Sequence, residues 1–176
     1  VALFATFEVL ILTLLPVYCL SQGFTEDIAL AMVSTVVVGD ALLQLPIGAL
    51  ADRISRRGLF TGCAVILLCS SLAIPLLLGT VLIWPLWVLF GASAGGLFTL
   101  SLILIGERYR DDALVRANAH VAQLWGIGCL IGPLVAGAGS QWVSGHAMLL
   151  LVAAGAFGLL VLLLRQGAFG EAQAAL

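Results

Sequence analysis

The sequence contains few charged residues and no lysine. Charged residues make up 9% of its 176 positions, whereas soluble domains carry about 25%. Hydrophobic residues make up 62%. So few charges cannot cover a water-facing surface, which excludes a soluble globular enzyme. The net charge of -2 and the lack of a basic run also exclude a nucleic-acid partner.

Cysteine and histidine, the residues that form disulfides and bind metals, are also few. The four cysteines, Cys19, Cys63, Cys69 and Cys129, all lie in apolar stretches and do not have the paired spacing of metal ligands. His120 has no second histidine or cysteine at ligand spacing. We therefore expect no disulfide scaffold, no metal site and no cofactor.

Long apolar runs dominate what remains. A helix that crosses the hydrocarbon core of a bilayer needs about 20 mostly apolar residues. Six such runs cover residues 1–20, 28–50, 59–78, 82–105, 114–138 and 147–164. The links between them are too short to hold a soluble domain. The sequence thus predicts an all-α membrane protein, with residues 1–176 as a single six-helix transmembrane domain in the lipid bilayer.

The arginines predict an orientation. They lie in the second link (Arg53, Arg56, Arg57), in or beside the fourth (Arg108, Arg110, Arg116) and after the last run (Arg165). With six spans, these places all fall on the same side of the membrane. Basic residues favour the cytoplasmic side. We expect a multi-pass protein of the cytoplasmic (inner) membrane with both chain ends in the cytoplasm.

The start of the sequence lies inside a hydrophobic run. Val1 is preceded by neither an initiator methionine nor a basic leader. A secretory signal would show a charged start and a small-residue cleavage site. The expectation is therefore a fragment, with a segment missing before Val1.

A polar motif follows the second run. Residues 48–57 read GALADRISRR. Gly48 would allow close approach of another helix. Asp52 lies one helical turn before Arg56 and can pair with it. A simple positive-inside anchor accounts for the arginines but not for the glycine and the acid at this spacing.

The motif resembles a signature of the major facilitator superfamily, roughly Gly-x-Leu-Ala-Asp-Arg-x-Gly-Arg-Arg/Lys. The matching positions are Gly48, Leu50, Ala51, Asp52, Arg53, Arg56 and Arg57. Ser55 departs from the glycine of the family. The resemblance extends over nearly the whole chain and implies half of the family's fold, which has twelve spans in two halves of 3+3 inverted repeats.

Two stretches bear on which half this is. Leu14–Tyr18 and Asn118–Pro133 look like the C-terminal half of bacterial permeases in this superfamily. The motifs of the two halves are similar, so an N-terminal half stays open. In either case the resemblance implies that the missing six-helix half is a partner.

The resemblance also implies a role for the motif. In the family its acid docks on the cytoplasmic end of a helix from the opposite half and steadies the outward-facing state. Carried over, Gly48, Asp52, Arg53, Arg56 and Arg57 form a conformational latch, in which the arginines hold Asp52.

Two carboxyl residues lie deep inside predicted spans. Glu8 and Asp40 are the only charges of the first and second runs. A charge at the centre of a bilayer costs about 2.5–3.5 kcal/mol, so each must face protein or water. Gln44 lies one turn beyond Asp40 and can hydrogen-bond to it. Proton coupling or substrate binding is one interpretation of Glu8, Asp40 and Gln44, and hydrogen bonding that only fixes helix packing is the other.

The fifth run supplies weaker candidates for the transport pathway, namely Asn118, Gln123 and Trp125. Asn118 and Gln123 lie in the first turns, where a hydrated interfacial role is favoured. Trp125 lies deepest of the tryptophans.

The leading functional hypothesis is a fragment of a secondary active transporter that moves a small-molecule substrate by alternating access, with proton coupling as an option. A self-standing, half-size six-helix protein that dimerises is the alternative. A membrane enzyme is disfavoured because Glu107, Asp111 and Asp112 form the only acid cluster and no phosphate-binding loop accompanies them. These acids are expected to offset the nearby arginines.

Overall fold

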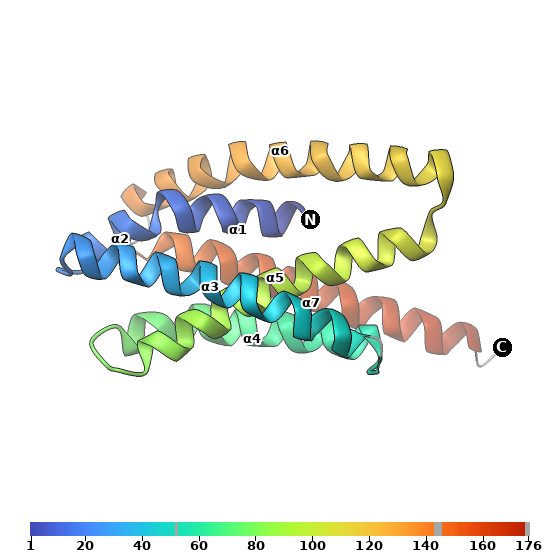
Figure 1. Cartoon of the computed structure of the whole chain (residues 1–176), viewed down its shortest axis with the longest axis horizontal. Coiled ribbons are helices and arrows are strands. Elements are labelled where there is room, and N and C mark those ends of the chain that lie inside the picture. The colour runs from blue at the N-terminus through green and yellow to red at the C-terminus, as the bar shows by residue number, and fades with distance from the viewer. Residues whose placement is uncertain (52, 143–145, 175–176) are drawn as a thin grey trace.

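The computed structural model describes the backbone of residues 1–51, 53–142 and 146–174, with their side chains except at 2, 140–142 and 166–174. Within these ranges the chain is helical and has no strand. The helices are α1 (Ala2–Thr13), α2 (Leu15–Ser21), α3 (Glu26–Ala51), α4 (Arg56–Leu77), α5 (Ile83–Arg108), α6 (Asp111–Trp142) and α7 (Ala147–Ala174) (Figure 1). The expected all-α class is confirmed.

Five of these helices are long and apolar enough to cross a membrane. The first predicted run, residues 1–20, is divided into α1 and α2, whose axes differ by 49°. Pro16, in the first turn of α2, explains the break. Proline has no amide hydrogen and clashes with the preceding helical turn, so a straight helix cannot continue through it. Counted as one bent span, the pair brings the total to six.

Several helices continue beyond the apolar runs that predicted them, three of them by three residues or more at their C-terminal ends. The helix of the run at 82–105 begins at Ile83 and ends at Arg108. The run at 114–138 lies within Asp111–Trp142, and the run at 147–164 lies within a helix ending at Ala174. Hydrophobicity marks only the part of a helix that lipid can surround. Arginine, glutamate and glutamine are good helix formers, so these helices extend past that part.

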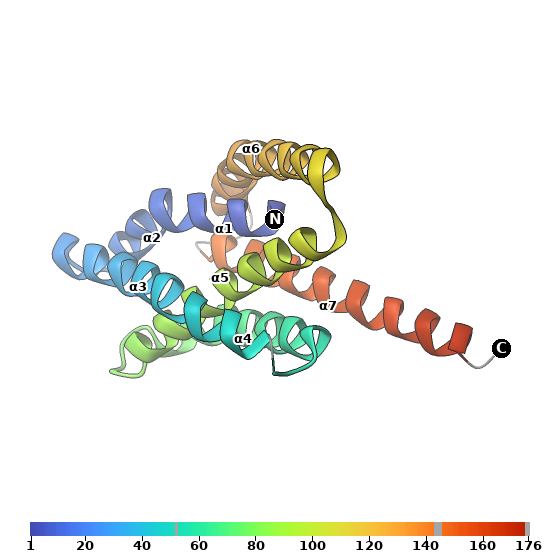
Figure 2. The same cartoon turned by 45° about the vertical axis from the view of Figure 1, so that its right-hand side comes forward.

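Helix α5 is the centre of the bundle. It packs against α3 and α4, while α6 packs against α1 and α7 packs against α4. Figures 1 and 2 both show α1 and α6 side by side on one side of the molecule and α3, α4 and α5 on the other. In the apolar stretch of α5, half of the residues are buried inside the bundle, compared with 22% in the apolar stretch of α3 and 17% in that of α6. Most of the surface of α3 and α6 is therefore free to contact lipid or protein.

Glycines bring α3 and α5 into close contact. A Cβ atom on Gly39 would lie 2.8 Å from the Cα of Val88, and one on Gly91 would lie 2.9 Å from the carbonyl carbon of Val36. Such distances are shorter than side-chain packing permits. A Cβ on Gly48 would meet only the Cγ2 of Thr99, at 4.0 Å. Within this chain, the close approach expected at Gly48 occurs nearer the middle of α3.

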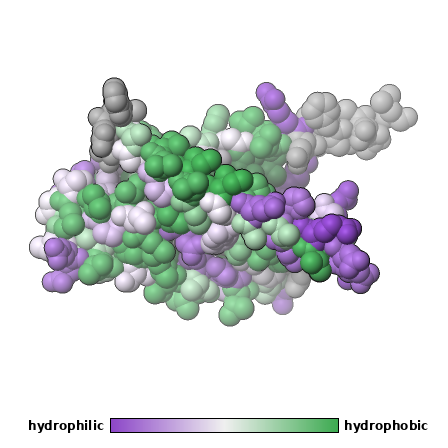
Figure 3. Space-filling view, turned by 90° about the horizontal axis from the view of Figure 1, so that it is seen from above, coloured by the Kyte–Doolittle hydropathy of each residue, from purple (hydrophilic) through white to green (hydrophobic). Residues whose placement is uncertain are grey.

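The two ends of the bundle differ in charge. Helices α3 and α5 end, and α4 and α6 begin, at the same end (Figure 1). We call this the basic end; it carries Arg53, Arg56, Arg57, Arg108, Arg110 and Arg116. Seen from above, the face between the ends is mostly hydrophobic, and hydrophilic residues gather toward the ends (Figure 3). This is the pattern of a chain surrounded by lipid around its middle.

Candidate functional site

The two carboxyl residues inside the predicted spans line the same cavity. Glu8 from α1 and Asp40 from α3 face a space of about 100 Å³ whose other walls are apolar. Leu12 and Val37, which also line it, are 55% and 45% exposed, so the cavity lies at the surface of the bundle. The sequence predicted both carboxyls but not their pairing, because the rotation of one helix against another is not encoded in the spacing of residues along either.

The Asp40 carboxylate contacts two residues. Gln44 Nε2 donates a hydrogen bond to Asp40 Oδ1 at 2.9 Å, which confirms the predicted bond. The same oxygen lies against Gly95 of α5, where a Cβ atom would overlap Oδ1. Gly95 was not among the predicted site residues. Its place four residues after Gly91 is a spacing typical of close helix contacts and predicts tight packing, but it does not predict a contact with Asp40.

Two arginines of the motif have partners on other helices. Arg56 forms an ion pair with Glu107 at the end of α5. Arg57 donates from Nη2 to the backbone carbonyl of Leu163 in α7, at 2.8 Å. Arg53 is exposed, and Asp52 lies outside the described residues. The expectation that Glu107 offsets a nearby arginine is confirmed, and this pair links α4 to α5 at the basic end.

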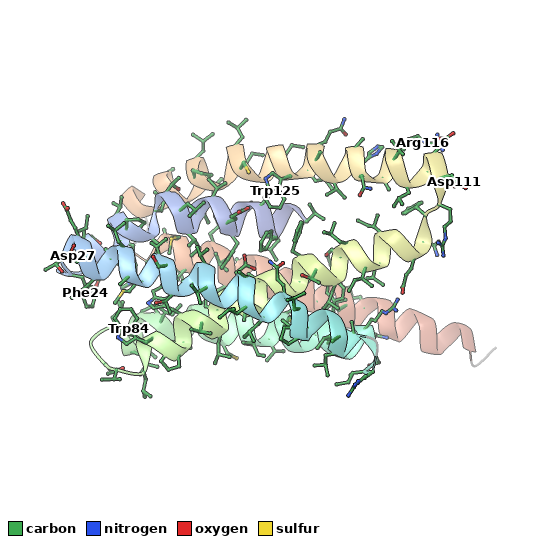
Figure 4. The ribbon with its side chains drawn as sticks, viewed as in Figure 1. Phe24, Asp27, Trp84, Asp111, Arg116 and Trp125 are labelled. Atoms are coloured by element: carbon green, nitrogen blue, oxygen red, sulfur yellow. The ribbon has the colours of Figure 1, made fainter. Side chains whose placement is uncertain are left out.

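The candidates on α6 divide into two groups. Asn118 and Gln123 are exposed. Trp125 is half-buried, with its ring centroid 5.6 Å from that of Phe4 and 5.4 Å from that of Phe98. It thus lies between α6 and α1 (Figure 4). A pathway role for these three residues stays a prediction.

The ends of the molecule carry other polar contacts. Tyr18 Oη and His146 Nδ1 lie 2.9 Å apart and join α2 to the start of α7. Figure 4 places Phe24, Asp27 and Trp84 at one end of the molecule, and Asp111 and Arg116 at the basic end. Over the described part of the chain, no group of three histidine, cysteine, aspartate or glutamate side chains is arranged to hold a metal ion.

Comparison with known proteins agrees with this architecture. Residues 1–173 match the family model described as Major Facilitator Superfamily. An uncharacterised MFS-type transporter of Enterobacter sp. is 29% identical over 157 residues, and one of Yersinia enterocolitica is 27% identical over 153. In both cases the match covers 87% of this chain and 39% of the relative.

A more distant relative shows the same pattern. An uncharacterised MFS-type transporter of Bacillus subtilis is 24% identical over 127 residues, which is 69% of this chain and 31% of that protein. No solved structure matches the chain significantly. The chain therefore spans well under half the length of the curated relatives it matches.

Proposed function

Because the chain belongs to the major facilitator superfamily, we propose that it forms part of a secondary active transporter that moves a small solute across a membrane by alternating access. The family and the apolar helices make it a multi-pass membrane protein. Members of this family are generally not enzymes. The observation that carries the proposal is the match over residues 1–173 together with the carboxyl pair that the fold brings into one cavity.

We propose that the chain is the C-terminal six-helix half. Leu14–Tyr18 and Asn118–Pro133 support this assignment by resemblance. The packing supports a 3+3 repeat, in which the bent pair α1–α2 corresponds to α5, α3 to α6 and α4 to α7. Under this correspondence the contact between α3 and α5 matches the contact between α6 and α1, and the contact between α4 and α7 matches itself. The exposed sides of α3 and α6 are the proposed contact surface for the other half.

The proposed location is the cytoplasmic membrane, with the basic end in the cytoplasm. Six arginines at one end of the bundle support this orientation, because basic residues are retained on the cytoplasmic side during insertion. Both ends of the chain would then be cytoplasmic. Reaction of a membrane-impermeant thiol reagent with a cysteine placed at Arg110 tests the orientation: labelling from outside intact cells would contradict it.

The proposed coupling site is the pair Glu8 and Asp40. Two carboxyl groups that share a small cavity in an apolar surrounding repel each other when both are ionised. Gln44 orients the Asp40 carboxylate through its hydrogen bond, and Glu8 lines the same cavity from α1. A proton bound here from one side and released to the other would couple to the movement of the two halves.

The test uses the full-length gene product in proteoliposomes. A thermal-stabilisation screen identifies a solute, and its transport is measured with and without an imposed pH gradient. Glu8→Gln and Asp40→Asn should abolish accumulation driven by the gradient but retain exchange of the solute. Glu26→Gln, an exposed acid in the first turn of α3, is the control and should behave as wild type.

Two results would contradict this proposal at different levels. Gradient-driven accumulation that persists in both carboxyl variants would remove the coupling site but leave the transporter. The absence of any transported solute, with a six-helix gene product that purifies as a dimer, would instead favour the half-size alternative.

The latch is proposed separately. It consists of Gly48, Asp52, Arg53, Arg56 and Arg57, and Asp52 would contact a helix of the other half. An acid near a helix N-terminus is stabilised by about 0.3–1 kcal/mol. Asp52→Asn in the full-length protein should lower transport and shift the resting state toward inward-facing, as measured by cysteine accessibility from the two sides. Unchanged transport and accessibility would exclude the latch.

A further inference from the structure

A second cavity lies at the basic end, away from the carboxyl pair. It has a volume of about 450 Å³ and is lined by Arg56, Arg57, Phe60, Leu104 and Leu163. Three helices, α4, α5 and α7, contribute to it. Its walls therefore combine two guanidinium groups with three large apolar side chains.

The charge in this cavity is predominantly positive. Glu107 pairs with Arg56, whereas Arg57 donates to the backbone carbonyl of Leu163, which carries no net charge. A guanidinium has five N–H donors, so this bond leaves donors for a further acceptor. The first turn of α4 contains Arg56 and Arg57 but no acid, and the positive end of the helix dipole adds to their field.

The apolar wall leads to a further space. Phe60 also lines a cavity of about 380 Å³ between α1, α4, α5 and α7, in which Ser101 is the one polar side chain among the lining residues. The two cavities therefore share Phe60 as a lining residue. A ligand that fits both must carry a negative charge at one end and a hydrocarbon segment at the other.

We propose that Arg57 and Arg56 bind the phosphate of an anionic phospholipid, whose acyl chain lies along Phe60 and Leu163. Arginine binds phosphate through two parallel hydrogen bonds. Basic pockets between transmembrane helices bind anionic lipid head groups in the same way. The site lies at the basic end of α4, α5 and α7, where the polar end of the bundle meets its apolar middle. This inference does not depend on the transport proposal.

The apolar lining distinguishes a lipid from a soluble anion. Inorganic phosphate would satisfy the guanidinium groups but leave the walls formed by Phe60, Leu104 and Leu163 uncovered. A zwitterionic lipid would cover these walls, but its positive head group would meet two arginines. Only an anionic lipid satisfies both parts of the cavity.

The test compares lipids added to the full-length gene product in a neutral detergent. Phosphatidylglycerol should raise the thermal unfolding midpoint more than phosphatidylcholine with the same acyl chains, and inorganic phosphate should not raise it. Arg57→Gln should weaken the apparent affinity for phosphatidylglycerol about fivefold, because one arginine–lipid contact contributes about 1 kcal/mol to the binding free energy. Arg110→Gln removes a charge from the same end but not from the lining, and should keep wild-type affinity.

A second variant separates lipid binding from a folding defect. Arg57→Lys keeps the charge but loses the planar fork, so it should retain part of the preference for phosphatidylglycerol. Equal stabilisation by both lipids, stabilisation by phosphate alone, or an equal loss in Arg57→Gln and Arg110→Gln would each overturn the proposal.

Discussion

The Asp40 carboxylate lies against Gly95, so a residue of α5 without a side chain makes room for the charged group of α3. The same crossing brings Gly91 against the backbone at Val36. Close helix packing and the placement of the carboxyl are therefore one structural feature. Any side chain at position 95 must either move Asp40 or separate the two helices.

Gly95→Ala should lower the free energy of unfolding by about 1–3 kcal/mol, because the added methyl group overpacks the crossing. Thermal unfolding of the full-length protein in detergent measures this effect. Gly106→Ala lies on the same helix, where an added Cβ meets nothing within 4 Å. This control should be neutral or stabilising, since alanine favours helix over glycine by about 1 kcal/mol. Equal behaviour of the two variants would show that the crossing is not as tight as described.

The ion pair between Arg56 and Glu107 should contribute only modestly to stability. Both side chains are partly exposed, at 33% and 46%, and exposed pairs contribute about 0.2–1 kcal/mol. A double-mutant cycle with Arg56→Gln and Glu107→Gln should give a coupling energy in this range that falls as salt is raised. The exposed Arg53 serves as the comparison, and Arg53→Gln should not couple to Glu107→Gln. A coupling energy of zero at low salt would contradict the pairing.

The hydrogen bond between Tyr18 and His146 should stabilise the end of the bundle opposite the basic end. Tyr18 is only 5% exposed, so Tyr18→Phe removes a bond that water cannot replace. The expected loss is about 0.5–1.5 kcal/mol in unfolding free energy. Tyr109→Phe, at a position 41% exposed, should change stability much less. If Tyr18→Phe unfolds at the same temperature as wild type, the bond does not tie α2 to α7.

Local features of the fold could be predicted well. The six apolar runs correspond to five long helices and the bent pair α1–α2. The bond from Gln44 to Asp40 was predicted because residues four apart lie on the same side of a helix. The bend at Pro16 and the helix ends beyond the apolar runs were not predicted, because hydropathy reports burial in lipid rather than helix continuity.

Relations between helices were not accessible in the same way. Glu8 and Asp40 are each conspicuous in sequence, yet their shared cavity depends on how α1 and α3 are rotated about their axes. The ion pair between Arg56 and Glu107 joins two residues more than fifty positions apart in the sequence. The room for Asp40 comes from Gly95 on a different helix.

The sequence by itself determined that this chain is a membrane protein, how many spans it can form, and which charged residues lie inside those spans. Each of these follows from composition and from the spacing of residues along one helix. Only the tertiary structure decided which of those residues meet. Helices in a bilayer associate through close packing of small side chains and a few polar contacts rather than through hydrophobic burial, so the crossing at Gly39, Gly91 and Gly95 fixes how α3 is rotated against α5 and where Asp40 lies.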